Sequence, residues 1–119
     1  MSVQFAVLAS GSRGNSTFIQ SRGRGVLIDV GLGPRVLRER LLSVGADWDR
    51  LSAVILTHTH RDHIDIATLR TLATWRIPFY CHSGHCDDLA ETQGFQALHG
   101  LGLVREFDLY PFLLPNGFR

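Results

Sequence analysis

Lysine is absent from this sequence, in which all 12 basic residues are arginine against 11 acidic residues, so the formal net charge is only +1. This balance excludes the strongly basic composition of a protein that binds nucleic acid through its overall charge. Cysteine is also scarce, and Cys81 and Cys86 are too few for a disulfide framework. The sequence has neither a secretory-signal pattern nor an apolar run approaching the roughly 18 residues of a membrane-spanning helix. We therefore expect a cytoplasmic protein without a membrane span.

The arginines are unevenly distributed along the chain. Residues 13–40 carry six arginines against two acids, whereas residues 81–119 carry five acids against two arginines. A locally basic region could attract an anionic substrate. The simpler interpretation, solvated loops and helix faces that happen to be basic, is favoured by the sequence alone.

Short apolar runs alternate with segments of helical spacing. The expected strands are residues 3–9, 17–20, 26–28, 53–56, 79–81 and, with partial alternation, 101–109. The expected helices are residues 35–44 behind Pro34, a helix capped by Asp65 and ended before Pro78, and residues 83–93 followed by Gly94. This alternation predicts a mixed α/β arrangement with helices packed on a sheet.

Four side chains that can bind metal lie within six residues, directly after the expected strand 53–56. They are His58, His60, Asp62 and His63. Imidazole suits zinc and similar divalent metals, and a carboxylate adds a harder oxygen ligand. A polar loop with fortuitous histidines is the weaker alternative, because half of the six histidines lie in this one turn.

The spacing of these residues indicates hydrolytic chemistry. His58 and His60 can project in one direction from extended backbone, while Asp62 and His63 follow the turn and can face a second ion. One ion lowers the pKa of a bound water, and two can hold both a bridging hydroxide and the substrate oxygens. The pattern therefore predicts hydrolysis without a protein nucleophile.

Three segments carry a resemblance to a known family. They are the pattern H-x-H-x-D-H after a buried strand, the strand ending in Asp-x-Gly at residues 27–31, and the loop at residues 9–16. Together they resemble the metallo-β-lactamase superfamily of hydrolases, and the loop is similar to that of its bacterial YycJ-like branch. The resemblance runs from about Val3 to the last residue.

The resemblance implies an αββα sandwich, of which this chain supplies the N-terminal half, and two divalent metal ions, usually zinc and sometimes manganese or iron. It implies that His58 and His60 bind the first ion and that Asp62 and His63 bind the second. It also makes Asp62 a candidate catalytic residue that orients the attacking hydroxide.

Three further residues receive roles near this site. The resemblance implies that Asp29 supports the metal ligands from behind, and a cap or turn role for Asp29 remains the alternative. Ser12 and Asn15 lie in the loop expected on the substrate side.

The sequence also departs from the family pattern. Members complete the site with a third histidine, a bridging aspartate and a last histidine from their C-terminal half, and none of these is evident here. Residues 114–117 read Leu-Pro-Asn-Gly where related proteins tend to have a His-Asp pair. We therefore expect residues 1–119 to be a partial domain that lacks its C-terminal half and binds metal weakly.

Three hypotheses about function follow. The first is a divalent-metal-dependent hydrolase acting on phosphodiester bonds, with an anionic substrate such as nucleic acid, that is inactive as the bare chain unless its site is completed. The second is a noncatalytic truncated product or half-domain that needs a partner chain, such as a second copy completing the fold. The third, less favoured than a structural role for the cysteines, is a small zinc module at Cys81-His82-Ser83-Gly84-His85-Cys86.

Overall fold

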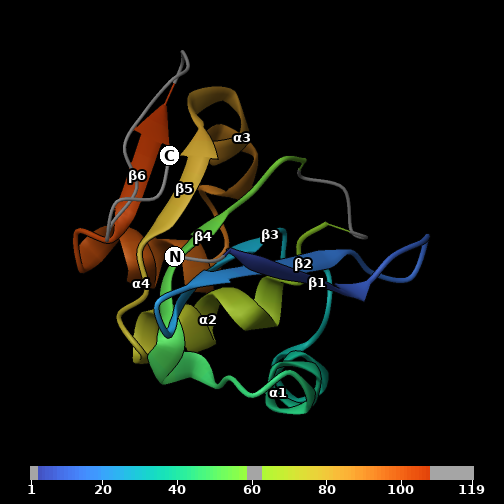
Figure 1. Ribbon diagram of the computed structural model, residues 1–119. Coiled ribbons are helices and arrows are strands. Elements are labelled where there is room, and N and C mark those ends of the chain that lie inside the picture. The colour runs from blue at the N-terminus through green and yellow to red at the C-terminus, as the bar shows by residue number, and fades with distance from the viewer. Residues whose placement is uncertain (1–2, 59–62, 108–119) are drawn as a thin grey trace.

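The computed structural model describes residues 3–58 and 63–107 of the chain. They form one six-stranded sheet in the order β1-β2-β3-β4-β5-β6, accompanied by helices (Figure 1). The strands are β1 Gln4–Ala9, β2 Ser16–Ser21, β3 Arg24–Ile28, β4 Leu51–Ile55, β5 Phe79–His82 and β6 Val104–Phe107. The helices are α1 Pro34–Ser43, the 3-10 turn η1 Trp48–Arg50, α2 Ile66–Thr74, α3 Ser83–Leu89 and α4 Gln93–Gly100. The expected mixed α/β arrangement is confirmed.

The direction of the strands changes across the sheet. Strands β1, β2 and β3 pair antiparallel, whereas β3, β4, β5 and β6 pair parallel. Because parallel strands run in one direction, their carboxyl ends meet at the same edge of the sheet. We call this edge the carboxyl rim; it is formed by the residues that end or directly follow β3, β4, β5 and β6. Open α/β sheets bind ligands at this edge, so the topology indicates the carboxyl rim as the location of a functional site.

One face of the sheet carries the main hydrophobic core. Leu27, Val54 and Phe79 point from three neighbouring strands into this core and are fully buried. The helices lie on this side of the sheet (Figure 1) and contribute Leu41 and Leu69, among others. Apolar burial of this extent fixes the register of the strands, because a shift by one residue would turn these side chains to the opposite face.

The ends of α1 and α2 follow the sequence signals. Pro34 is the first residue of α1, where its missing N–H leaves no helix bond unmade. Gly45 follows the helix with a φ of 82°, the left-handed conformation that glycine adopts without a steric penalty. Asp65 caps α2, since its Oδ1 accepts a hydrogen bond of 3.0 Å from the backbone N–H of Ala67. These expectations are confirmed.

Two expected elements differ from the structure. The single helix expected over residues 83–93 is wrong: α3 ends at Leu89, and a second helix, α4, begins at Gln93. Gly94 lies inside α4 because it allows close packing on α2; a Cβ there would be 2.7 Å from that of Leu69. The strand expected from residue 101 begins only at Val104, and residues 108–109 of that expectation lie outside the described residues.

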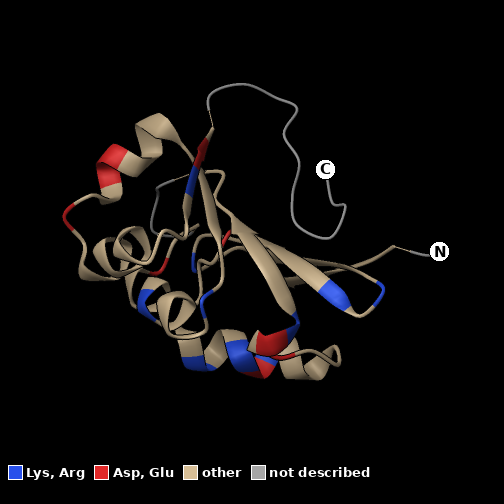
Figure 2. Ribbon diagram, turned by 90° about the vertical axis from the view of Figure 1, so that its left-hand side faces the viewer, with Lys and Arg blue, Asp and Glu red and all other residues tan. Residues whose placement is uncertain are grey.

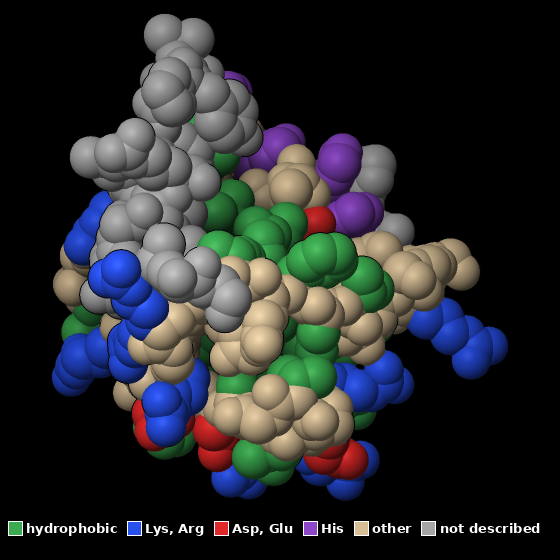
Figure 3. All heavy atoms as spheres, viewed as in Figure 1, with side chains coloured by type: hydrophobic (Ala, Val, Ile, Leu, Met, Phe, Trp, Pro, Cys, Tyr) green, Lys and Arg blue, Asp and Glu red, His purple; other side chains and the backbone are tan. Residues whose placement is uncertain are grey.

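The other face of the sheet is also apolar but carries none of the described helices. Val26, Ala53 and Tyr80 form a small cluster on it, separate from the main core. At the β1 edge, Phe5 and Val7 are 74% and 60% exposed. Figure 3 shows hydrophobic side chains gathered in the middle of this face and histidine side chains along its upper border. Among the described residues, the sheet is therefore covered by helices on one face and carries a smaller apolar cluster on the other. Within the described residues, no helix is long and apolar enough to cross a membrane.

Candidate metal centre

Asp29 directly follows β3 and is locked into an uncommon backbone conformation. Its φ is 65°, a left-handed value that aspartate tolerates better than most other residues. The backbone N–H of Asp29 donates to the carbonyl oxygen of Ile55 at 2.8 Å, and the carbonyl of Asp29 accepts from Ser16 Oγ at 2.8 Å. These bonds hold the Asp29 carboxylate at the carboxyl rim, where the residue is only 5% exposed.

The Asp29 carboxylate accepts three hydrogen bonds. Its Oδ1 accepts from the backbone N–H of Thr57 at 2.7 Å, and its Oδ2 accepts from Thr57 Oγ1 at 2.6 Å. The Nδ1 of His63 lies 2.7 Å from the same Oδ2. An ionised carboxylate can only accept, so the proton of this last bond belongs to His63 Nδ1. Asp29 therefore fixes the orientation and the tautomer of His63.

Thr57 extends this arrangement to His58. The hydroxyl of Thr57 has one proton, and the contact with Asp29 uses it. His58 Nδ1 lies 3.0 Å from Thr57 Oγ1, so it must donate its own proton to the hydroxyl oxygen. Both rings consequently carry the proton on Nδ1 and the lone pair on Nε2, which is the tautomer in which histidine binds a metal through Nε2.

The rings of His58 and His63 lie close together at the rim. Their centroids are 4.7 Å apart and their planes are inclined by 50°. The backbone keeps them there, because Val30 N–H donates to the carbonyl of His63 at 2.9 Å and Asp65 N–H donates to the carbonyl of Val30 at 2.7 Å. The two residues at the ends of the His-rich turn are thus tied to the same strand end, although they are five positions apart in the sequence.

His60 and Asp62, the other two expected ligands, lie outside the described residues. Within residues 3–58 and 63–107, no group of three or more His, Cys, Asp or Glu side chains could hold a metal ion. The described donors nevertheless fit a metal, because both imidazoles are held in the tautomer that leaves Nε2 able to coordinate. The structure therefore supplies two oriented histidines and the carboxylate that orients them.

The expected substrate-side loop lies beside this strand end. The side chain of Asn15 closes the loop, since its Oδ1 accepts from Gly11 N–H at 3.2 Å and its Nδ2 donates to the Gly11 carbonyl at 2.9 Å. Its backbone carbonyl accepts from Gly31 N–H at 2.9 Å. Gly14 permits this contact, because a Cβ there would lie 2.6 Å from the oxygen of Gly31. Ser12 is exposed on the loop.

Sequence reasoning did not identify Thr57 and Ser16 as parts of the site. Thr57 had one signal, its position between a buried strand and the first histidine. Ser16 had none, because its contact with Asp29 depends on the pairing of β2 with β3.

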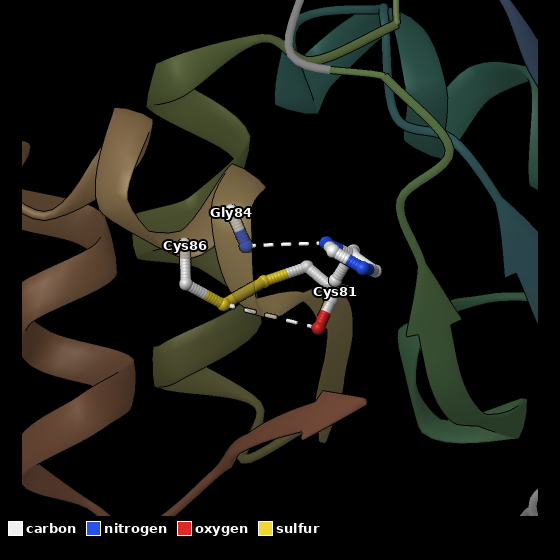
Figure 4. The surroundings of a disulfide bond; sticks show 4 residues. Cys81, Gly84 and Cys86 are labelled. Atoms are coloured by element: carbon white, nitrogen blue, oxygen red, sulfur yellow. Dashed lines mark hydrogen bonds between the residues drawn. A yellow bond between two sulfur atoms is a disulfide. The ribbon is translucent and has the colours of Figure 1, made fainter. Parts of the chain in front are cut away.

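Cys81 and Cys86 form a disulfide that joins the end of β5 to α3 (Figure 4). Both residues are buried, and their Cα atoms are 6.3 Å apart. Neither sulfur is present as a thiolate, the form in which cysteine binds zinc. The zinc module considered for residues 81–86 is therefore not formed, and the favoured structural role of the cysteines agrees with this cross-link.

Three of the six arginines in residues 13–40, namely Arg24, Arg38 and Arg40, make structural contacts away from the carboxyl rim. Arg40 donates to the carbonyl of Leu8 at 2.6 Å, and Arg38 pairs with Asp47 at 3.0 Å. Hydrogen bonding to Arg38 is the main cause that lowers the pKa of Asp47, while the same bond raises the pKa of Arg38. Figure 2 shows basic and acidic residues side by side on α1. The contacts agree with the simpler interpretation of the arginine excess; Arg13, exposed in the loop beside the rim, is an exception.

The mixed sheet with helices on one face, together with a carboxylate and two histidines at its carboxyl rim, places the chain in a class of proteins. The sequence profile of the metallo-beta-lactamase superfamily matches residues 9–100, and the chain belongs to this superfamily. Its members generally bind a pair of metal ions.

The sequence is also similar to those of individual proteins in this superfamily. The chain is 34% identical over 61 residues to exodeoxyribonuclease WalJ of Streptococcus pneumoniae serotype 2 (strain D39), a match covering 51% of this chain and 23% of WalJ. It is 33% identical over 64 residues to exodeoxyribonuclease YycJ of Bacillus anthracis, covering 54% and 24% respectively. The matches thus span about a quarter of these relatives.

The structure of AidC, a dizinc quorum-quenching lactonase, shares the fold with a TM-score of 0.64. It is 16% identical, and the match covers 83% of this chain and 44% of that one.

Proposed function

We propose that residues 1–119 form part of a divalent-metal-dependent hydrolase domain that acts on phosphodiester bonds in the manner of a nuclease. One observation carries the proposal: a single buried carboxylate, Asp29, holds His58 through Thr57 and His63 directly, leaving both Nε2 atoms able to coordinate. The names of the relatives WalJ and YycJ, both exodeoxyribonucleases, support the choice of substrate. Nucleic acid is accordingly the proposed anionic substrate.

Four residues are proposed as metal ligands: His58 and His60 for one ion, and Asp62 and His63 for a second. Zinc is the proposed metal, with manganese or iron as alternatives; AidC, which shares the fold, is described as dizinc. Such ions, when bound, lower the pKa of a coordinated water and stabilise negative charge on substrate oxygens. Asp62 is the proposed catalytic residue.

The residues around the ligands are proposed to position them and the substrate. Asp29 holds the imidazole rings in one orientation, so that little rearrangement is needed when the ligands are used. Ser12 and Asn15 are proposed to border the substrate, because the loop that carries them packs on Gly31 beside Asp29.

The test measures metal binding and hydrolysis separately on the full 119-residue chain. Chelator-treated protein is titrated with zinc and with manganese, and the reconstituted protein is assayed against bis(p-nitrophenyl) phosphate and a single-stranded DNA oligonucleotide. We expect His58→Ala and His63→Ala each to abolish the metal binding and any phosphodiester cleavage that the wild type shows. His99→Ala, which removes an exposed histidine of α4, serves as the control. Unchanged metal affinity in both site variants would contradict the proposal.

A second candidate function is a noncatalytic half-domain that needs a partner chain, such as a second copy. The apolar sheet face beside the exposed Phe5 and Val7 favours it. The two candidates differ in one measurement. Cleavage by the purified monomer supports the hydrolase. A monomer that binds metal but cleaves nothing, together with cleavage by the associated form alone, supports the half-domain.

A further inference from the structure

Two histidines outside the candidate metal centre, His82 and His85, lie on the same carboxyl rim. Ile55 of β4 pairs with Tyr80 of β5, and the backbone N–H of Leu56 donates to the carbonyl of Tyr80 at 2.9 Å. Thr57 and His82 each lie two residues beyond this pair in the sequence. Neighbouring strands are about 5 Å apart. His82 therefore lies next to the segment that carries Thr57 and His58.

The side chain of His82 belongs to a group of three rings. His82 pairs directly with Phe107 of β6, and their ring centroids are 6.1 Å apart at an angle of 87°. The ring of His85, one turn into α3, lies 5.9 Å from that of His82 at an angle of 62°. We call these three rings the aromatic ledge. Phe107 packs with the small cluster on the sheet face that carries none of the described helices.

The hydrogen bonding of the aromatic ledge leaves the proton of the exposed His82 ring on Nε2. The Nδ1 of His82 accepts from the backbone N–H of Gly84 at 3.2 Å, so the neutral ring carries its proton on Nε2. The Nδ1 of His85 is buried and has no hydrogen-bond partner, so the described residues give this ring no polar anchor. His82 and His85 belong to neither hydrophobic cluster and are not among the expected metal ligands, so their place at the rim of a ligand-binding edge needs another explanation.

We propose that the aromatic ledge binds a segment of single-stranded nucleic acid next to the candidate metal centre; this inference rests on the proposed function. Single strands are held by bases stacked on aromatic rings and by N–H donors to phosphate oxygens. The ledge offers the exposed ring of His82 with its Nε2–H, beside the partly exposed ring of His85. It carries the strand at the nucleotides that flank the cleaved bond.

The test measures binding without catalysis. A fluorescein-labelled oligothymidylate of about eight nucleotides is titrated with the full chain in EDTA, and fluorescence anisotropy gives the Kd. The variant is His82→Asn, because the asparagine oxygen can still accept the cap bond from Gly84 N–H while the ring and the Nε2–H are lost. We expect at least a tenfold weaker Kd, in line with stacking contributions to strand binding.

A matched control is His99→Asn, on the last turn of α4 and therefore near the start of β6 rather than at the carboxyl rim. We expect its Kd to stay within twofold of the wild type, with equal melting temperatures for both variants. The proposal that the aromatic ledge binds single-stranded nucleic acid would be contradicted if the wild type did not bind oligothymidylate, or if the wild type and His82→Asn had equal Kd values. The same variants are titrated with zinc: loss of binding in EDTA with unchanged zinc affinity in His82→Asn supports the ledge even if the wild type cleaves no phosphodiester.

Discussion

The hydroxyl of Thr57 connects the carboxylate of Asp29 to the ring of His58. It donates to the carboxylate of Asp29 at 2.6 Å and accepts from His58 Nδ1 at 3.0 Å. Asp29 therefore shares one chain of hydrogen bonds with two adjacent residues that lie far from it in the sequence. Such outer contacts typically change metal affinity by about 10-fold to 100-fold when they are removed.

Replacing Thr57 with valine tests this connection. Thr57→Val keeps the shape of the side chain but removes the hydroxyl that accepts from His58 Nδ1 and that supplies one of the two hydrogen bonds to Asp29 Oδ2. We expect zinc affinity to fall about 10-fold to 100-fold, measured by competition with a chromophoric chelator. Thr57→Ser retains the hydroxyl and should restore most of the affinity. Equal affinities in all three proteins would show that the hydroxyl does not orient His58.

The candidate site was only partly visible in the sequence. His58 and His63 could be named because imidazoles clustered in a short segment are a local signal. Asp29 was assigned from a resemblance, with a cap or turn role as the alternative; in the structure, Asp65 is the cap of α2 and Asp29 contacts Thr57 and His63. Thr57 could not be assigned a role, because its contact joins residues 28 positions apart through the pairing of β3 with β4.

Gly94 sets how closely α4 approaches α2. A Cβ at this position would be 2.7 Å from Leu69 Cβ and 2.8 Å from the backbone nitrogen of Arg70, which cannot move without disturbing α2. We expect Gly94→Ala to lower the free energy of unfolding by about 1–3 kcal/mol, measured by urea denaturation. The gain in helix propensity, about 1 kcal/mol, is smaller than this.

The control lies in the same helix. Gly100 ends α4, and a Cβ there would meet nothing within 4 Å. We expect Gly100→Ala to be neutral or stabilising by up to about 1 kcal/mol. If both alanine variants shift the urea midpoint alike, the packing of Gly94 on α2 does not limit stability.

The ion pair between α1 and the segment before β4 gives stability that depends on pH. Arg38 holds the pKa of Asp47 below its ordinary value, so folding favours the ionised carboxylate. The contribution is present above the unfolded pKa, about 3.9, and is lost as the pH falls through the lower folded pKa. We expect Asp47→Asn to destabilise the protein at pH 6 and to match the wild type more closely at pH 3, by urea denaturation. Arg38→Gln should remove most of this difference.

Helix ends and strand positions were predicted better than the division of the helices. Pro34, Gly45 and Asp65 act through the backbone of their own turn, so their sequence signals were sufficient. The break between α3 and α4 was not predicted, because Gly94 resembles a helix terminator locally. Its actual role depends on a contact with Leu69, which only the folded chain brings close.

At the scale of the whole molecule, the described helices cover one face of the sheet and leave the other without a helix from the described residues. Phe5 and Val7 are 74% and 60% exposed and point the same way from the edge strand β1, and Val3, just before this strand, is 61% exposed. Exposed apolar residues in a row on an edge strand favour association with another sheet. A second copy of the chain is the proposed occupant.

Sedimentation equilibrium tests this association. We expect the wild type to self-associate at micromolar concentration and the double variant Phe5→Ser, Val7→Ser to weaken association at least tenfold. Leu42→Ser, which replaces a 49% exposed leucine on α1, should leave it unchanged. A wild type that stays monomeric at the highest concentration would exclude self-association through this face.

The anchoring of both histidine rings to Asp29 also links ligand occupancy to thermal stability. Val30 and Ile64 form a parallel bridge there, so the strand end, the carboxylate and the two rings must separate together when this part of the sheet unfolds. A ligand that binds only the assembled rings shifts the equilibrium by mass action, by about 2.7 kcal/mol at one hundred times its Kd. The melting temperature should therefore rise with the logarithm of the zinc concentration. A thermal melt would then measure how much of the site at the end of β3 is occupied by zinc.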